Sequence, residues 1–123
     1  MKVKQIMNAV PVTARESSGL DSIVRVFGEQ DIGWMPILDE MGRVAGTITD
    51  LEVCTAALSR NRRLADLTAA SVMSRNVVLC QETASRDEVE KTLRLHHLHE
   101  IPVVDAQGRL SGVITWDDLR MVQ

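Results

Sequence analysis

The chain of 123 residues consists largely of one sequence unit that occurs twice in tandem. The stretch 35–49 (MPILDEMGRVAGTIT) aligns without a gap on 101–115 (IPVVDAQGRLSGVIT), at an offset of 66 residues. The same register places Met7 over Met73, near the start of each copy. Because a repeated unit usually buries its apolar face against its copy, the repeat predicts one module in which neither half need be stable alone.

Each copy has the residue pattern of two helices and three strands. Valine- and isoleucine-rich runs flank an Asp-x-x-Gly-Arg loop, which is typical of a hairpin. Ser18 and Ser85 precede acids at helix-capping spacing, and Thr49 and Thr115 stand where strand gives way to helix. A small mixed α/β (α+β type) sheet with helices on one face is therefore expected. The predicted elements are extended pieces at 12–13 and 77–79, helices at 20–30 and 87–97, strands at 35–38, 44–48, 101–104 and 110–114, and closing helices at 50–59 and 116–122.

The composition excludes several classes of function. A formal charge of −3 and an aromatic content of 2% argue against nucleic-acid binding, which needs a basic field and stacking platforms. No window approaches about 18 consecutive apolar residues, so no membrane span is expected. Without a signal peptide, Cys54 and Cys80 are expected to be free thiols of a cytoplasmic protein. The sequence has no nucleophile, acid and base at the spacing of a catalytic site, so neither enzymatic activity nor a catalytic cofactor is expected.

The repeat resembles the CBS domain pair, a family named after cystathionine β-synthase. The resemblance rests on motifs that both copies share: the Ile-Met and Val-Met pairs at 6–7 and 72–73, the proline-bearing first hairpin strands, and the run Gly-x-Ile-Thr-x-x-acid. It implies a stand-alone module of two β-α-β-β-α repeats related by a pseudo-twofold axis. The repeats would span residues 3–59 and 67–123, joined by a linker at 60–66.

The resemblance also implies a main ligand site at the second Gly-x-Ile-Thr-x-x-Asp run. Asp118 would lie in the first turn of a helix that begins after Thr115, and its carboxylate could accept hydrogen bonds from both ribose hydroxyls of an adenosyl ligand. Family sites are crossed, so the adenine wall would come from the other copy. The implied wall residues are Val12, Thr13, Ile32 and Gly33.

The first copy implies a second ligand site in which Glu replaces Asp. Glu52 is one methylene longer, so its carboxylate is expected to be pushed toward the sugar. The implied partners of this site are Thr49, Val78, Leu79, Leu98 and His99. His99 stands where family members often contact phosphates, although a solvated histidine at a helix end remains the alternative. For both sites, the simpler interpretation is a helix N-cap followed by a first-turn acid.

Two functions remain open. The first is a regulatory, signal-transducing module that senses AMP, ADP or ATP, or else NAD or S-adenosylmethionine, without catalysis. The second is a dimerisation or partner-interaction module whose clefts are empty or degenerate. Trp116 is either an interface contact or a cap on the core, and an exposed indole would favour a homodimer. His96, His97 and His99 cluster without an acid or cysteine at ligand spacing, so no metal site is expected.

Overall fold

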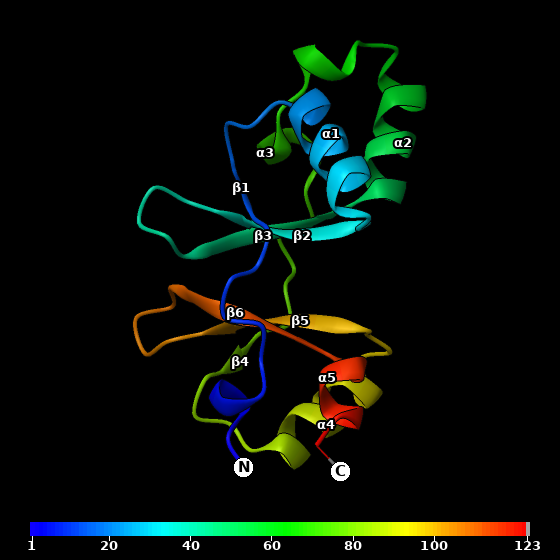
Figure 1. The fold of residues 1–123 in the computed structure, drawn as a ribbon. Helices are drawn as coiled ribbons and strands as arrows, with labels where there is room; N and C mark the ends of the chain where they lie inside the picture. Colours follow the sequence, from blue (N-terminus) through cyan, green and yellow to red (C-terminus); the bar gives the residue numbers. More distant parts are fainter. Residues whose placement is uncertain (123) are drawn as a thin grey trace. The chain divides into compact units, whose positions relative to one another are not determined.

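The computed structural model describes residues 1–122 and divides into two compact units (Figure 1). The central unit is Val12–Val77, and the terminal unit combines Met1–Pro11 with the chain from Val78 onward. Each unit holds one three-stranded sheet. Within residues 1–122, no helix is both long and apolar enough to cross a membrane.

The central unit has a sheet of strand order β1-β2-β3. β1 runs parallel to β2, and β2 runs antiparallel to β3. In Figure 1, helices α1 and α2 lie on the same side of this sheet. The elements are β1 (Ala14–Arg15), α1 (Leu20–Gln30), β2 (Trp34–Leu38), β3 (Val44–Thr49), α2 (Asp50–Arg60), a 3-10 turn η2 (Leu64–Asp66) and α3 (Ala69–Val72).

The terminal unit repeats this plan with the order β4-β5-β6, again parallel and then antiparallel. Together the two units confirm the predicted mixed α/β fold of repeated β-α-β-β-α elements. The elements are the 3-10 turn η1 (Val3–Gln5), β4 (Cys80–Gln81), α4 (Arg86–Leu95), β5 (Glu100–Val104), β6 (Leu110–Thr115) and α5 (Trp116–Arg120).

The hairpin loops form as the Asp-x-x-Gly-Arg pattern predicts. Gly42 and Gly108 both have φ of 81°, a left-handed conformation that glycine adopts without steric cost. Asp39 Oδ1 accepts the backbone N–H of Arg43 at 3.0 Å, and Asp105 makes the equivalent bond. This hydrogen bond from the Arg43 backbone is the main reason that the pKa of Asp39 lies below its ordinary value.

The first strand of each copy begins later than the sequence predicts. The extended pieces expected at 12–13 and 77–79 lie before the paired residues, because β1 starts at Ala14 and β4 at Cys80. Ladder hydrogen bonds define a strand, and pairing starts where Ala14 meets Ile37. The β-propensity of the preceding residues therefore does not set the boundary.

The ends of the first helices are set by left-handed residues. Helix α1 has the predicted bounds, 20–30, and Asp31 follows with φ of 54°. Helix α4 covers Arg86–Leu95 rather than 87–97, because His97 adopts φ of 55° and ends the helical path. Helix α5 also ends earlier than predicted, at Arg120, but the residue after it, Met121, has φ of −70° and is not left-handed.

One predicted helix cap is correct and the other is wrong. Ser85 caps α4, since its side chain accepts the backbone N–H of Glu88 at 3.2 Å. In the first copy, Gly19 occupies the N-cap position and makes no side-chain cap. Ser18 Oγ instead accepts the backbone N–H of Arg15 at 3.0 Å, so this serine stabilises the turn after β1.

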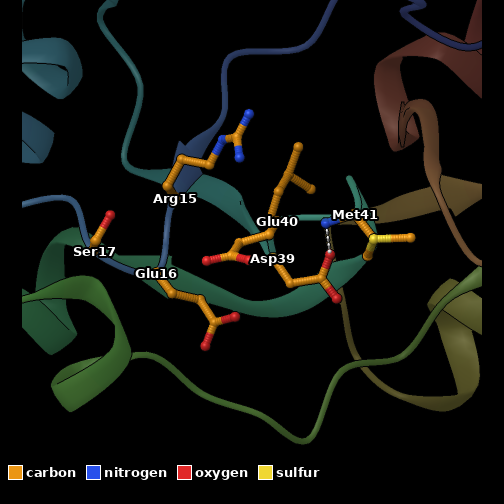
Figure 2. A pocket seen from close by; sticks show the side chains of 7 residues that line it. Arg15, Glu16, Ser17, Asp39, Glu40 and Met41 are labelled. Atoms are coloured by element: carbon orange, nitrogen blue, oxygen red, sulfur yellow. Dashed lines mark hydrogen bonds between the residues drawn. The ribbon is translucent and has the colours of Figure 1, made fainter.

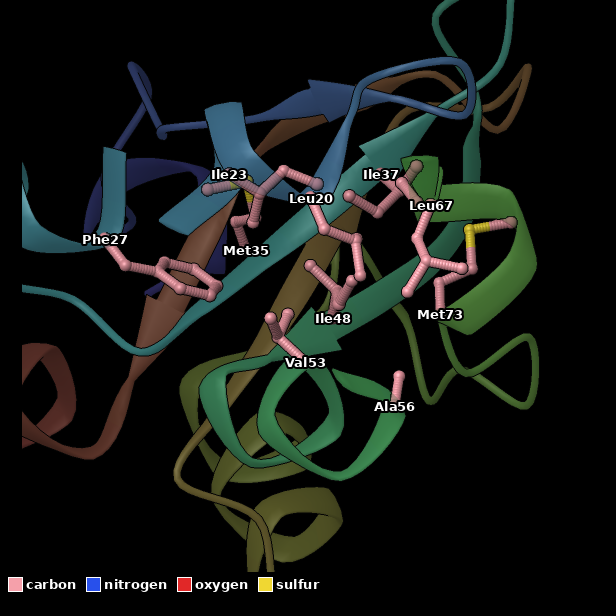
Figure 3. Packing of buried hydrophobic residues seen from close by; sticks show 11 residues of the cluster. Leu20, Ile23, Phe27, Met35, Ile37, Ile48, Val53, Ala56, Leu67 and Met73 are labelled. Carbon is pink, nitrogen blue, oxygen red and sulfur yellow. The ribbon is translucent and has the colours of Figure 1, made fainter. Parts of the chain in front are cut away.

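Each unit has its own apolar core. In the central unit, α1 packs on the sheet through Leu20, Ile23 and Phe27, whereas Val24 is 39% exposed and lies outside the core (Figure 3). In the terminal unit the counterparts Val89 and Leu93 are fully buried. The central cluster consists of Leu20, Ile23, Phe27, Met35, Ile37, Ile48, Val53, Ala56, Leu67, Ala69 and Met73.

The compact units are not the two sequence copies. Val3, from the opening of the first copy, is fully buried in the core of the terminal unit. Conversely, Leu67 and Met73, from the opening of the second copy, are buried in the core of the central unit. The opening segment of each copy therefore completes the unit that is built on the other copy.

Candidate functional site

The second strand-to-helix junction holds Thr115 and Asp118 in mutual contact. Thr115 Oγ1 accepts the backbone N–H of Asp118 at 3.2 Å, and Asp118 Oδ2 accepts the backbone N–H of Thr115 at 2.9 Å. Both residues are half-buried. This capping box satisfies two backbone donors at the start of α5, as expected of an N-cap threonine.

The first junction has the same arrangement. Glu52 Oε1 accepts the backbone N–H of Thr49 at 2.9 Å and its hydroxyl at 3.1 Å, while Thr49 Oγ1 accepts the backbone N–H of Glu52 at 3.1 Å. The longer Glu52 side chain thus forms the same capping box as Asp118, and the expectation that its carboxylate is pushed toward the sugar stays a prediction. The additional methylene of Glu52 is accommodated by folding back onto Thr49.

Each capping acid retains one carboxylate oxygen for another donor. Within residues 1–122, no hydrogen bond reaches Asp118 Oδ1 or Glu52 Oε2. An ionised carboxylate has about four lone-pair sites, and the cap uses only some of them. The junctions can therefore cap a helix and still accept hydrogen bonds from a hydroxyl-bearing ligand.

The predicted wall residues of the main site belong to the central unit. Gly33 immediately precedes β2, and its carbonyl accepts the backbone N–H of Asp50, the first residue of α2, at 3.0 Å. A Cβ at Gly33 would come within 2.7 Å of Asp50 Oδ2, so this position suits glycine. Val12 and Ile32 pack against the central core, and Thr13 lines a pocket of about 310 Å³.

The predicted wall residues of the second site belong to the terminal unit. Val78 and Leu98 pack against the terminal core, and Leu79 lines a pocket of about 470 Å³. The carbonyl of Leu98 accepts the indole N–H of Trp116 at 2.9 Å. The carbonyl of His99 accepts the backbone N–H of Trp116 at 3.1 Å.

The structure thus distributes each predicted site over both units. Thr115 and Asp118 lie in the terminal unit, whereas the wall predicted for them lies in the central unit. The terminal unit therefore contains the Thr-acid pair of the main site and the predicted wall of the second site. These lie close together, because Thr115 pairs across the hairpin with Glu100, the neighbour of His99. The composition of the complete sites stays a prediction.

Trp116 is not the exposed indole that an interface contact would need. It is half-buried, packs against the terminal core and donates its N–H to Leu98. The Arg94 guanidinium lies 5.7 Å from the centre of its ring, a distance typical of a cation–π contact. Nearby, burial raises the pKa of Glu100 above its ordinary value, although the charge of His99 opposes the shift.

The pockets lined by Thr13 and Leu79 occupy equivalent places in the two units, between the first strand and the following helix. The one beside β1 is lined by Ser22 and Val26 of α1, and the one beside β4 is lined by Glu88 and Thr92 of α4, each 66 residues on. Thr13 and Leu79 were predicted as site residues, whereas the helix residues of these two linings were not. The repeat register would have related the two linings, although it could not show that they enclose a space.

The hairpin turn of the central unit borders another hollow, of about 700 Å³, that the sequence did not suggest (Figure 2). Acidic side chains from two segments meet there: Glu16 after β1, and Asp39 and Glu40 at the turn. Arg15 is the one basic side chain of its lining. No signal in the sequence places these segments together, because they are separated by α1 and β2.

The repeated β-α-β-β-α elements and the paired Thr-acid junctions match a known family over nearly the whole chain. The family model described as "CBS domain" matches residues 3–59 and 69–123. This chain belongs to the CBS domain family. The resemblance inferred from the sequence motifs is thereby confirmed.

This CBS pair is similar to segments of larger proteins. It is 29% identical over 117 residues to an L-aspartate semialdehyde sulfurtransferase of Methanocaldococcus jannaschii. The match covers 95% of this chain but 22% of the length of the sulfurtransferase. The CBS pair therefore corresponds to a minor part of that enzyme.

Solved CBS pairs share the fold. The CBS domain pair of protein MJ0100, in complex with 5′-methylthioadenosine and S-adenosyl-L-methionine, superposes with a TM-score of 0.83 at 26% identity, covering 99% of this chain and 94% of that one. CBSX2 in complex with AMP has a TM-score of 0.84 at 17% identity, covering 98% and 93%. At that lower identity the likeness to CBSX2 shows the fold alone.

Proposed function

We propose that this CBS pair is a regulatory module that binds an adenosyl ribonucleotide and performs no catalysis. The main support is that the chain has a complete Thr-x-x-Asp junction and is similar to the MJ0100 pair, whose complex contains two adenosyl compounds. AMP, ADP and ATP are the first ligands to test, and NAD and S-adenosylmethionine are the others. Binding would serve signal transduction in the cytoplasm by changing how the module acts on a protein partner.

In the proposed main site, Asp118 accepts hydrogen bonds from the ribose hydroxyls through Oδ1, the carboxylate oxygen that is not used in the helix cap. Thr115 holds that carboxylate in place through the capping box. A preorganised acceptor is favourable for binding, because the side chain loses little freedom when the ligand arrives. Val12, Thr13, Ile32 and Gly33 are proposed to contact the adenine.

The proposed second site uses Glu52 in the same manner, since Glu52 Oε1 is engaged by Thr49 and Oε2 is not. Val78, Leu79 and Leu98 are its proposed wall, and His99 is proposed to contact the anionic end of a nucleotide. The similar geometry of the two junctions gives Glu52 a usable acceptor despite its greater length.

A dimerisation or partner-interaction module is the second candidate function. Both junction acids already have a structural role in helix capping, which requires no ligand. Leu51 and Leu58 lie two turns apart on α2 and are 72% and 86% exposed. Such a surface favours a protein contact, with a homodimer as the first expectation.

The decisive experiment separates capping from ligand binding at Asp118. In Asp118→Asn, the amide oxygen can still accept the Thr115 N–H, but the charge and the second acceptor oxygen are lost. We expect little change in the free energy of unfolding and a nucleotide Kd at least about tenfold higher, since a charge-assisted hydrogen bond contributes about 1.5–3 kcal/mol. Calorimetric titration with the five ligands, each with and without Mg²⁺, measures this.

A deoxynucleotide supplies the matched control on the ligand side. The 2′-deoxy form should bind more weakly than the ribonucleotide to the wild type and about equally to Asp118→Asn. Equal Kd values for wild type and Asp118→Asn would refute the assigned role of Asp118. The absence of binding by all five ligands would refute the sensing function and leave the interaction module.

A further inference from the structure

The groove between α4 and α5 gathers basic side chains around an indole. Arg86 and Arg94 lie on one face of α4, two turns apart, and Arg120 ends α5. They line a pocket of about 430 Å³ together with Trp116 and His99. The remaining lining residues are Glu90 and Leu119.

The positive charge of this groove is only partly neutralised. Glu90 is the one carboxylate in the lining and is shared, since its two oxygens lie 3.0 Å from Arg86 and 3.0 Å from Arg94. Two further acids pair with these arginines from outside the lining: Asp87 lies 3.6 Å from Arg86 and Asp117 lies 2.8 Å from Arg120, and their side chains are 93% and 86% exposed. Three guanidinium groups therefore face one lining carboxylate, on a chain whose overall formal charge is −3.

The donors of the groove are also incompletely used. Arg86 is held by Glu90 and by the carbonyl of Leu119, at 3.1 Å, yet its Nε is buried without a hydrogen-bond partner within residues 1–122. The side chains of Arg94 and Arg120 are 72% and 67% exposed, which leaves most of their N–H groups accessible. A fixed Arg86 beside two accessible guanidinium groups is an arrangement suited to an oxyanion.

The repeat shows that the CBS fold does not require these charges. At an offset of 66 residues, neutral residues stand in place of the three arginines: Leu20, Gly28 and Cys54. Val24 replaces the shared Glu90. The same fold thus forms in the central unit without any of these basic residues, so the charged groove is a property of the terminal unit alone.

We propose that the α4–α5 groove is a binding site for an oxyanion, a phosphate or diphosphate group borne by a small molecule. Arginine forks bind phosphate oxygens in bidentate geometry, and the groove offers two exposed ones, Arg94 and Arg120, beside the fixed charge of Arg86. The proposal does not depend on an adenosyl ligand, because the three arginines that carry it are not among the residues proposed to contact a nucleotide; His99, which the groove shares with the proposed second site, is not needed for it. Arg94 rests over Trp116, so an anion that draws the guanidinium away changes the surroundings of the indole.

The test uses that indole as the reporter. The chain has two tryptophans, so Trp34→Phe leaves Trp116 as the only one. Titration of this protein with inorganic pyrophosphate, and separately with orthophosphate, should give a saturable change in Trp116 fluorescence. Sodium chloride at matched ionic strength should not reproduce it.

Variants in the Trp34→Phe background locate the anion. Arg94→Gln and Arg120→Gln, both at exposed side chains, should each raise the Kd for pyrophosphate at least tenfold. Arg62→Gln, at an exposed position outside the groove, should leave it unchanged. No saturable signal, an unchanged Kd in both groove variants, or an equal loss in Arg62→Gln would overturn the proposal, and none of these outcomes bears on adenosine binding.

Discussion

At the scale of single residues, two glycines of this CBS pair have opposite roles. Gly112 in β6 lies against the opening segment of the chain, where a Cβ would come within 2.5 Å of the Asn8 carbonyl and 2.7 Å of Met7 Sδ. Gly28 in α1 faces open space, with nothing within 4 Å of an added Cβ. Residue type alone does not distinguish these positions, but the close approach of the Asn8 backbone does.

The first prediction follows from this contrast. Gly112→Ala should lower the free energy of unfolding by about 1–3 kcal/mol, because the backbone of Asn8 must move to admit the methyl group. Gly28→Ala is the matched control and should raise it by about 0.5–1 kcal/mol, since alanine is the better helix former. Denaturant unfolding measures both, and a stable Gly112→Ala protein would contradict the close approach.

At the scale of secondary-structure elements, the N-terminal segment behaves as part of the terminal unit. The backbone N–H of Val3 bonds to the carbonyl of Ala84 at 2.8 Å, and that of Asn8 bonds to Val113 at 2.9 Å. The Val3 side chain is fully buried, whereas Val10 is 85% exposed. The segment is therefore held in the terminal unit at Val3 and Asn8, whereas Val10, near its end, is exposed to solvent.

Val3→Ala is accordingly expected to destabilise the protein by about 2 kcal/mol, the cost of removing two buried carbons and leaving a small cavity. The same truncation at Val10 should change the free energy of unfolding by less than about 0.5 kcal/mol, since Val10 is already in contact with water. Chemical denaturation compares the two variants. Equal effects would mean that the opening segment does not complete the terminal core.

At the scale of the whole molecule, exposed apolar side chains on α2 point to self-association. Leu51 and Leu58 are exposed, although the same helix buries other apolar side chains, such as Val53, in the central core. A surface of this kind is commonly covered by a second copy in small domains. The prediction of a homodimer rests on these leucines rather than on Trp116, which the terminal core already covers.

Light scattering at tens of micromolar should therefore give a dimer mass for the wild type. Leu58→Arg should shift the mass toward the monomer, because a charge replaces an apolar contact. Val10→Arg, at an equally exposed position outside α2, should have no effect. A monomeric wild type, or dissociation by both variants, would refute self-association through α2.

The repeat, the order of the elements and the paired junctions can all be predicted from the amino-acid sequence. These features are local: the positive φ of Gly42 and Gly108, the threonine caps and the alternating hairpin strands depend on residues a few positions apart. For the same reason α1 was predicted with its observed bounds. The Thr-x-x-acid spacing likewise sufficed to place Asp118 and Glu52 at helix starts.

Which segments share a core, and where charged side chains collect, depends on the three-dimensional packing of the chain. The burial of Val3 among residues of β5 and β6 joins positions about a hundred residues apart, and no local pattern records such a contact. The α4–α5 groove likewise unites Arg86, Arg94 and Arg120 from two helices separated by a hairpin. Packing brings such side chains together because burying apolar helix faces fixes where their polar edges meet.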